Sequence, residues 1–148
     1  MTYQTAMKLN MSKHWVAVQY LCLTAVLHAA KKLKLTYKDE IWTTVKVSCE
    51  FDLDATSLED RAWAHCSLCE LYLLQVLNQQ DEKEAENATQ KVLYHTSAVL
   101  EIAPSNPFII YSTRRQLLRY VDWWSGYFGE SSSRIIKVAK DALKIFDA

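Results

Sequence analysis

The sequence motif with the clearest chemical potential is His65-Cys66-x-x-Cys69. A Cys-x-x-Cys pair can bind zinc or exchange disulfides. A structural zinc site needs a second pair of ligands, and a redox pair belongs at a helix N-terminus after a strand. This pair lies inside an apolar helical pattern, so we expect buried core thiols and keep a metal or redox site as the alternative. The other possible ligands are isolated in the sequence: Cys22, Cys49, His28 and His95.

Catalytic motifs of other kinds are missing from the sequence. There is no Gly-x-Ser-x-Gly, and two glycines in the whole chain exclude a Gly-rich phosphate loop. Glu70 lies within an apolar helical stretch, where burial perturbs the pKa of a carboxylate. It is open to three interpretations: a catalytic acid, a paired structural charge, or a contact facing a groove. We predict no enzymatic activity, no cofactor and no metal.

Arginines and aromatic residues gather between positions 111 and 127. Arg114, Arg115 and Arg119 lie there together with five aromatic residues, and Arg and aromatics dominate interface hot spots. They also suit stacking on single-stranded nucleic acid, but 17 basic and 17 acidic residues balance, which argues against a dedicated nucleic-acid binder. The alternative is an ordinary solvated basic face. The aromatic residues are Tyr111, Tyr120, Trp123, Trp124 and Tyr127.

The elements that must position these residues are helices. The chain has 148 residues, which suits a single domain over positions 1–148. Two glycines and two prolines are too few for the many tight turns of an all-β fold. Periodicity and capping residues predict six helices, with Asp81 as one N-cap and Asn106-Pro107 as the start of another. Their predicted ranges are 12–32, 36–50, 57–79, 81–103, 106–127 and a last helix that begins at the serines 131–133.

The first predicted helix is apolar enough to raise the question of a membrane or a signal peptide. Its stripe includes Trp15, Val18 and Cys22, but the apolar run is shorter than the roughly 20 residues of a membrane span. Polar residues interrupt it, and no small-x-small cleavage site follows. We therefore expect a buried helix and no membrane segment. The four cysteines show no disulfide framework, which favours a soluble protein of the cytoplasm.

Positions 45–53 carry two conflicting patterns. Val45 and Cys49 fit the inner face of a helix that also contains Ile41. Apolar and polar residues also alternate from position 45 to 53, which is typical of a strand. A lone strand would leave its backbone without a partner, so we favour a helix to about position 50 followed by an extended exit.

The order of long helix, turn and helix occurs three times, at intervals of about 45 residues, within the range of helical arrays. Residues 98–107, Ala-Val-Leu-Glu-Ile-Ala-Pro-Ser-Asn-Pro, resemble the end of the second helix and the turn of a tetratricopeptide repeat. Residues 141–147 look like a second copy of that ending, and His65-x-x-Leu68-Cys69-x-x-Tyr72 is similar to its first-helix pattern W-x-x-L-G-x-x-Y. The family unit is 34 residues, shorter than the spacing here.

This resemblance implies three stacked antiparallel hairpins, a tetratricopeptide-like α-solenoid, against the alternative of a non-repeating helical bundle. It also implies peptide or protein binding on a concave surface lined by the first helix of each pair. We therefore expect an all-α, non-catalytic scaffold that binds a protein or peptide. A self-associating assembly subunit is the alternative. The expected contact residues are Trp63, Glu70, Tyr111, Arg115, Arg119 and Trp123, with Cys66 beside them.

Overall fold

The computed structural model describes residues 14–30, 39–78, 81–127 and 132–147, and over these ranges it is helical and contains no strand. The all-α prediction is therefore confirmed. The predicted helix ends at 12, 32, 36 and 79, and the serine cap at 131, lie outside the described residues. The α-helices are α2 (His14–Ala30), α3 (Asp39–Asp52), α4 (Leu58–Asn78), α5 (Glu82–Ile102), α6 (Pro107–Leu118) and α7 (Ser132–Asp147).

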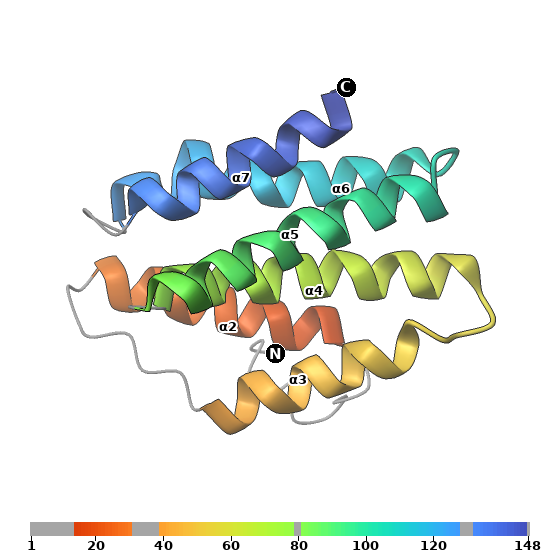
Figure 1. Ribbon diagram of the computed structural model, residues 1–148, viewed down its shortest axis with the longest axis horizontal. Helices are drawn as coiled ribbons and strands as arrows, with labels where there is room; N and C mark the ends of the chain where they lie inside the picture. Colours follow the sequence, from red (N-terminus) through yellow and green to blue (C-terminus); the bar gives the residue numbers. More distant parts are fainter. Residues whose placement is uncertain (1–13, 31–38, 79–80, 128–131, 148) are drawn as a thin grey trace.

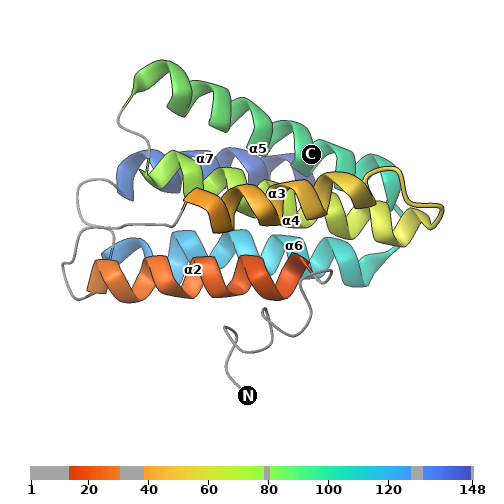
Figure 2. The same ribbon diagram turned by 90° about the horizontal axis from the view of Figure 1, so that it is seen from below.

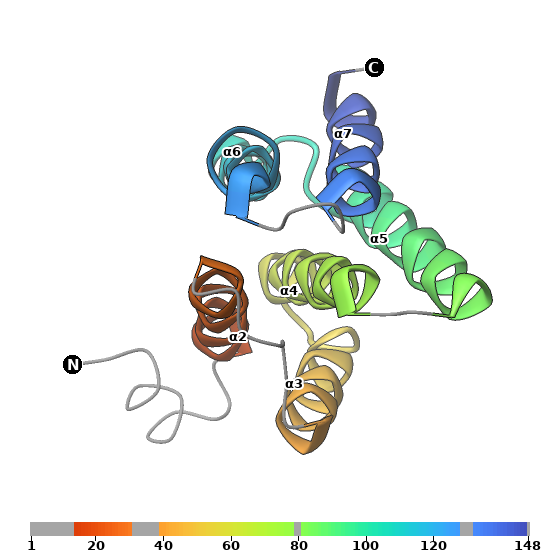
Figure 3. The ribbon, with the colours of Figure 1, turned by 90° about the vertical axis from the view of Figure 1, so that its left-hand side faces the viewer.

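Consecutive helices run antiparallel and form three hairpins, α2 with α3, α4 with α5, and α6 with α7 (Figure 1). The first helices of the hairpins, α2, α4 and α6, all run in one direction (Figures 1 and 2). Seen end-on, α4 lies in the centre, with α2 and α6 to one side of it and α3, α5 and α7 around its remaining sides (Figure 3).

The central place of α4 explains its sequence. Alanines and leucines are buried all round this helix, including Ala62, Leu68, Leu71 and Leu74, as expected when neighbours cover every face. The main core joins α4 to every other helix, and a smaller cluster at one end is formed by Ala62, Val99, Ala103 and Ile109. None of the described helices is long and apolar enough to cross a membrane.

The contested stretch 45–53 is helical up to Asp52. The helix α3 extends to Asp52, with Val45 and Cys49 buried and Val47 and Phe51 exposed. The predicted extended exit is wrong, because the chain leaves α3 through a turn in which the Leu53 amide donates to the Glu50 carbonyl at 3.2 Å. Helical packing on α4 therefore overrides the alternating pattern.

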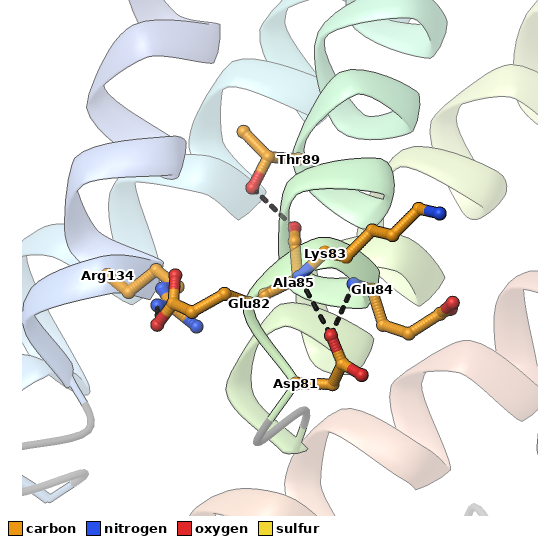
Figure 4. Close-up of polar contacts among 7 residues, drawn as sticks. All are labelled: Asp81, Glu82, Lys83, Glu84, Ala85, Thr89 and Arg134. Carbon is orange, nitrogen blue, oxygen red and sulfur yellow. Dashed lines mark hydrogen bonds and ion pairs between the residues drawn. The ribbon is translucent and has the colours of Figure 1, made fainter.

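Two predicted helix starts are confirmed by their capping bonds. The carboxylate of Asp81 accepts hydrogen bonds from the amides of Lys83 (2.8 Å) and Glu84 (3.4 Å) at the start of α5 (Figure 4). The side chain of Asn106 accepts from the Ile109 amide at 3.2 Å, with Pro107 as the first residue of α6. These caps satisfy amides that have no partner within the helix.

The fifth helix is not regular over its predicted length. The α-helix stops at Leu118, and the chain continues as a π-helical turn (Arg119–Trp123) and a 3₁₀ turn (Ser125–Tyr127). The Trp124 amide donates to the Arg119 carbonyl at 2.9 Å, five residues back. Tyr120 is fully buried in this turn, whereas Trp123 is 72% exposed.

A pair of histidines lies between α4 and α5. The Nδ1 atoms of His65 and His95 are 2.8 Å apart, so one ring donates and the other accepts. The His95 ring stacks on Tyr72 with a centroid separation of 5.8 Å, and Tyr94 packs edge-on against it. Burial lowers the pKa of both histidines, and the neighbouring positive charge of His65 and Lys91 helps to bring the pKa of His95 to about 3.

Candidate binding groove

A cavity of about 790 Å³ lies between the first helices of the three hairpins. Its walls are α2, α4 and α6 with the following π turn, and one residue of α3 reaches its edge. Such a volume is typical of a ligand site. We call this cavity the groove. It is lined by His14, Trp15, Val18, Gln19, Asp52, Asp60, Trp63, Cys66, Ser67, Cys69, Glu70, Leu73, Phe108, Tyr111, Ser112, Thr113, Arg115, Gln116, Leu117, Arg119 and Tyr120.

All the predicted contact residues except Trp123 line this groove. They belong to the first helices of the second and third hairpins and the π turn that follows, where the resemblance and the clustering of Arg and aromatic residues predict them. Trp123 is exposed in the π turn and is not among the lining residues. In an uninterrupted α-helix, Trp123 would lie on the same face as Arg119 and Tyr120. The π turn changes this register.

The groove walls carry aromatic side chains that are open to solvent. Trp15 is 52%, Phe108 66% and Tyr111 60% exposed. Trp63 is half-buried and meets the Phe108 ring edge-to-face, with ring centroids 5.9 Å apart. These exposed rings offer contact area for an apolar partner group.

Trp15 and Phe108 were not predicted as groove residues. The sequence predicts Trp15 on the inner stripe of the first helix, but its ring is exposed, whereas Val18 and Cys22 of that stripe are fully buried. The signal for Phe108 was in the sequence, because Phe108, Tyr111 and Arg115 are spaced at i, i+3 and i+7 and so share one face of α6.

Glu70 forms the polar floor of the groove, where α2 and α6 meet across α4. Its carboxylate accepts hydrogen bonds from the amide groups of Gln116 (2.6 Å) and Gln19 (3.2 Å) and from the hydroxyl of Tyr120 (3.0 Å). Desolvation by burial raises the pKa of Glu70 above its ordinary value, and the hydrogen bonds from Gln116 and Tyr120 oppose the rise. In the described part of the chain no ion pair includes Glu70. Of the three earlier interpretations, the geometry combines a hydrogen-bonded structural role with a position facing the groove.

The two ends of α2 differ in how they meet α6. At the Glu70 level the Gln116 amide approaches the Gln19 carbonyl at 3.4 Å, and the Tyr120 hydroxyl lies 3.1 Å from the Cys22 sulfur. At the N-terminal end of α2, the hydrogen bonds among described residues run to α3 and α4 and not to α6. The groove is therefore closed at the Tyr120 end and bordered by His14 at the other, which we call the mouth.

The mouth carries a hydrogen-bonded triplet that the sequence did not reveal. His14 Nε2 lies 3.0 Å from the Asp52 carboxylate, and His14 Nδ1 lies 2.6 Å from the Ser67 hydroxyl. Burial lowers the pKa of His14, although Asp52 acts against this. A neutral ring satisfies both contacts when Nε2 donates to Asp52 and Nδ1 accepts from Ser67. No local spacing could have indicated this triplet, because its members come from three different helices.

The three arginines of α6 and the π turn contact different parts of the molecule. Arg114 points away and forms an ion pair with Asp147 of α7 at 3.1 Å. Arg119 donates to the Gln116 side chain at 3.0 Å and so joins the floor. Arg115 is exposed on the groove wall and makes no hydrogen bond or ion pair with another described residue. Only part of the predicted basic face therefore belongs to the groove.

The Cys66 and Cys69 thiols take part in packing. Cys66 lies 2.7 Å from the Thr113 hydroxyl and Cys69 lies 3.2 Å from the Thr96 hydroxyl, on opposite neighbours of α4. Burial raises the pKa of each thiol to about 12, so little reactive thiolate forms at neutral pH. All four cysteines lie in described segments and are free thiols. No group of three or more metal-ligating side chains occurs among the described residues.

Comparison with protein-family models, with curated proteins and with solved structures finds no match to this chain. The groove is therefore interpreted from its own residues and their geometry.

Proposed function

We propose that this protein is a non-catalytic scaffold that binds a peptide or protein segment in the groove between α2, α4 and α6. The observation that carries the proposal is the row of exposed aromatic rings on the groove walls, Trp15, Phe108 and Tyr111. Apolar surface gathered around a concavity is typical of an interaction site. Aromatic side chains of this kind contribute much of the binding energy at interfaces.

The resemblance to tetratricopeptide repeats supports the same proposal. That resemblance implies binding on a concave surface lined by the first helix of each hairpin. The groove walls belong to the first helices of three successive hairpins, which run in one direction. The chain thus has a cavity on the side where the resemblance implies a partner.

The chemistry of the groove also favours binding over catalysis. The oxygens of Glu70 accept bonds from Gln19, Gln116 and Tyr120, which are neutral donors, and this arrangement holds the carboxylate in place. The nearest thiols have pKa values of about 12. All four cysteines are free, which supports our further proposal of a reducing compartment, the cytoplasm.

The test is affinity capture from the native host, read out by mass spectrometry, with the full chain and two variants. Phe108→Ser combined with Tyr111→Ser removes two exposed rings from the groove. Val47→Ser is the matched control, because Val47 is exposed on α3 and does not line the groove. The wild type and the control should retain the same partners, and the groove variant should lose them while its circular dichroism stays unchanged. Equal capture by all three proteins would refute the proposal.

A second candidate function is self-association or incorporation into a larger complex. It is favoured by Trp123, which is 72% exposed outside the groove. Light scattering over a range of protein concentrations measures self-association directly. If Trp123 mediates it, Trp123→Ser shifts the molar mass toward the monomer. A wild type that is monomeric at every concentration rules out the homo-oligomer.

A further inference from the structure

Two charges of opposite sign face the groove without an ion-pair partner among the described residues. Arg115 is exposed on the α6 wall, and Asp60 is exposed near the N-terminus of α4, beside the mouth. Neither side chain forms a hydrogen bond or ion pair with another described residue. The other acid at the mouth, Asp52, is already bonded to His14. Asp60 and Arg115 therefore remain available to charged groups of a partner.

The distance between these charges follows from the register of the two helices. The helices α4 and α6 run in the same direction, and they pair Trp63 with Phe108 and Glu70 with Gln116. The offsets are 108 − 63 = 45 and 116 − 70 = 46, so Arg115 stands level with position 69 or 70 of α4. Asp60 lies nine or ten positions earlier, which at a rise of about 1.5 Å per residue separates the charges by about 14 Å along the groove.

This separation matches an extended occupant. Four residues of extended chain cover about 13 Å, at about 3.3 Å per residue. An extended segment therefore reaches both charges with a short stretch of chain.

Alternate residues of an extended chain point to the same side. Residues i, i+2 and i+4 would therefore face the groove together. The first reaches Asp60, the last reaches Arg115, and the middle one meets the rings of Trp63, Phe108 and Tyr111 that lie between them.

We propose that the groove takes an extended partner segment in which a basic, an apolar or aromatic, and an acidic residue occupy positions i, i+2 and i+4. The basic residue pairs with Asp60 and the acidic residue with Arg115. This inference rests on the proposed function and adds the sequence class of the ligand and its position along the groove.

The first experiment selects binders to the full chain from a displayed library of random twelve-residue peptides. The expected result is enrichment of peptides with opposite charges four positions apart and an apolar residue midway. Enriched peptides that lack this charge pattern, but lose binding to Phe108→Ser with Tyr111→Ser, would overturn the inference and leave the proposed function standing. Absence of any enrichment that depends on these two residues would overturn both.

The second experiment tests each charge contact with synthetic peptides. The parent is a capped peptide with Lys, Phe and Glu at positions i, i+2 and i+4 and alanine between them, and its partner has Lys in place of Glu. Arg115→Glu should weaken binding of the parent on the order of five- to tenfold and should strengthen binding of the second peptide. Lys137→Glu, on the exposed face of α7, is the control and should change neither affinity.

Asp60→Lys is tested in the same way with a peptide in which Glu replaces Lys. This variant should bind the parent peptide more weakly, and the Glu-substituted peptide more strongly, than the wild type does. Moving the two charges to positions i and i+2 should abolish the sensitivity to Arg115→Glu. If both protein variants bind the parent as tightly as the wild type does, the charge contacts do not exist and the inference is wrong.

Discussion

The two sides of α4 bury titratable groups in different ways. On the groove side, the Glu70 carboxylate receives bonds from three neutral donors and lines a cavity open to solvent. On the α5 side, His65 and His95 bond to each other and are enclosed by tyrosine rings. One helix thus carries a polar site that lines the groove on one side and a histidine pair packed against tyrosine rings on the other.

The comparison teaches that burial acts on the two sites with opposite signs. Burial raises the pKa of Glu70, so the folded state holds its proton more tightly than the unfolded state, and this contribution to stability is lost as pH rises. Burial lowers the pKa of His95 from 6.5 to about 3, so the unfolded state takes up the proton first, and stability is lost as pH falls.

The largest expected effect is acid destabilisation by the histidine pair. Between pH 6.5 and about 3, His95 should contribute up to tenfold per pH unit to the unfolding equilibrium. Protonation of the accepting Nδ1 would place two N–H groups opposite each other, with their nitrogens 2.8 Å apart. Urea denaturation across this pH range measures it, and His95→Phe should flatten the slope relative to Tyr94→Phe, which leaves the pair intact. Equal slopes in the two variants would show that the histidine pair does not titrate as described.

Next in size is the loss of the Tyr120 hydroxyl, which donates its proton to Glu70 and lies 3.1 Å from the Cys22 sulfur. Tyr120→Phe should lower the free energy of unfolding by about 1–3 kcal/mol, because a buried carboxylate loses a donor. The matched control on the same wall is Tyr111→Phe, whose ring is exposed and whose change should be close to zero. Urea denaturation at pH 7 compares the two variants. A Tyr120→Phe variant as stable as the control would show that the Tyr120 hydroxyl does not stabilise the buried Glu70 carboxylate.

A smaller effect is expected from Glu70→Gln, which keeps the shape of the side chain and removes its titration. The wild type should lose stability as pH rises from the ordinary glutamate pKa of about 4.3 through the raised pKa of Glu70, at most about 1.4 kcal/mol for each pH unit. The variant should lack this decline. The measurement is the difference in unfolding free energy between the two proteins from pH 4 to 8, and a difference that does not change with pH would contradict the raised pKa.

The smallest effect belongs to a residue outside both sites. Asp81→Ala removes the cap of α5 and should cost about 1 kcal/mol. The variant should be less stable at neutral pH. The pH dependence of its unfolding free energy between pH 4 and 8 should equal that of the wild type, because Asp81 contacts neither Glu70 nor the histidines. A changed slope would mean that the two sites are coupled through α5.

Local sequence signals predicted the helices well. Caps at Asp81 and Asn106 act through neighbouring amides, so their effect can be recognised within a few residues. The stretch 45–53 was harder, since both periods were present and packing of Val45 and Cys49 decided between them. The π turn after Leu118 gave no local signal that distinguished it from a regular helix.

The groove was predictable only in part. Resemblance and residue type pointed to Trp63, Tyr111 and Arg115, because the sequence spacing on their helices shows which positions share a face. The triplet of His14, Asp52 and Ser67 depends on how three helices meet, which no short-range pattern encodes. For the same reason the sequence suggested that Glu70 was buried but could not identify its donors.

The π turn of residues 119–123 has a consequence for insertions and deletions in this chain. A π turn holds one more residue than the α-helical turn it replaces. Deleting Asp122 would allow α6 to continue as a regular α-helix, and each following residue would then rotate by about 100° around the axis. Trp124 would leave its place against Tyr120, and the approach to α7 would change with it. This segment should therefore tolerate substitutions at Trp123 much better than any change in its length.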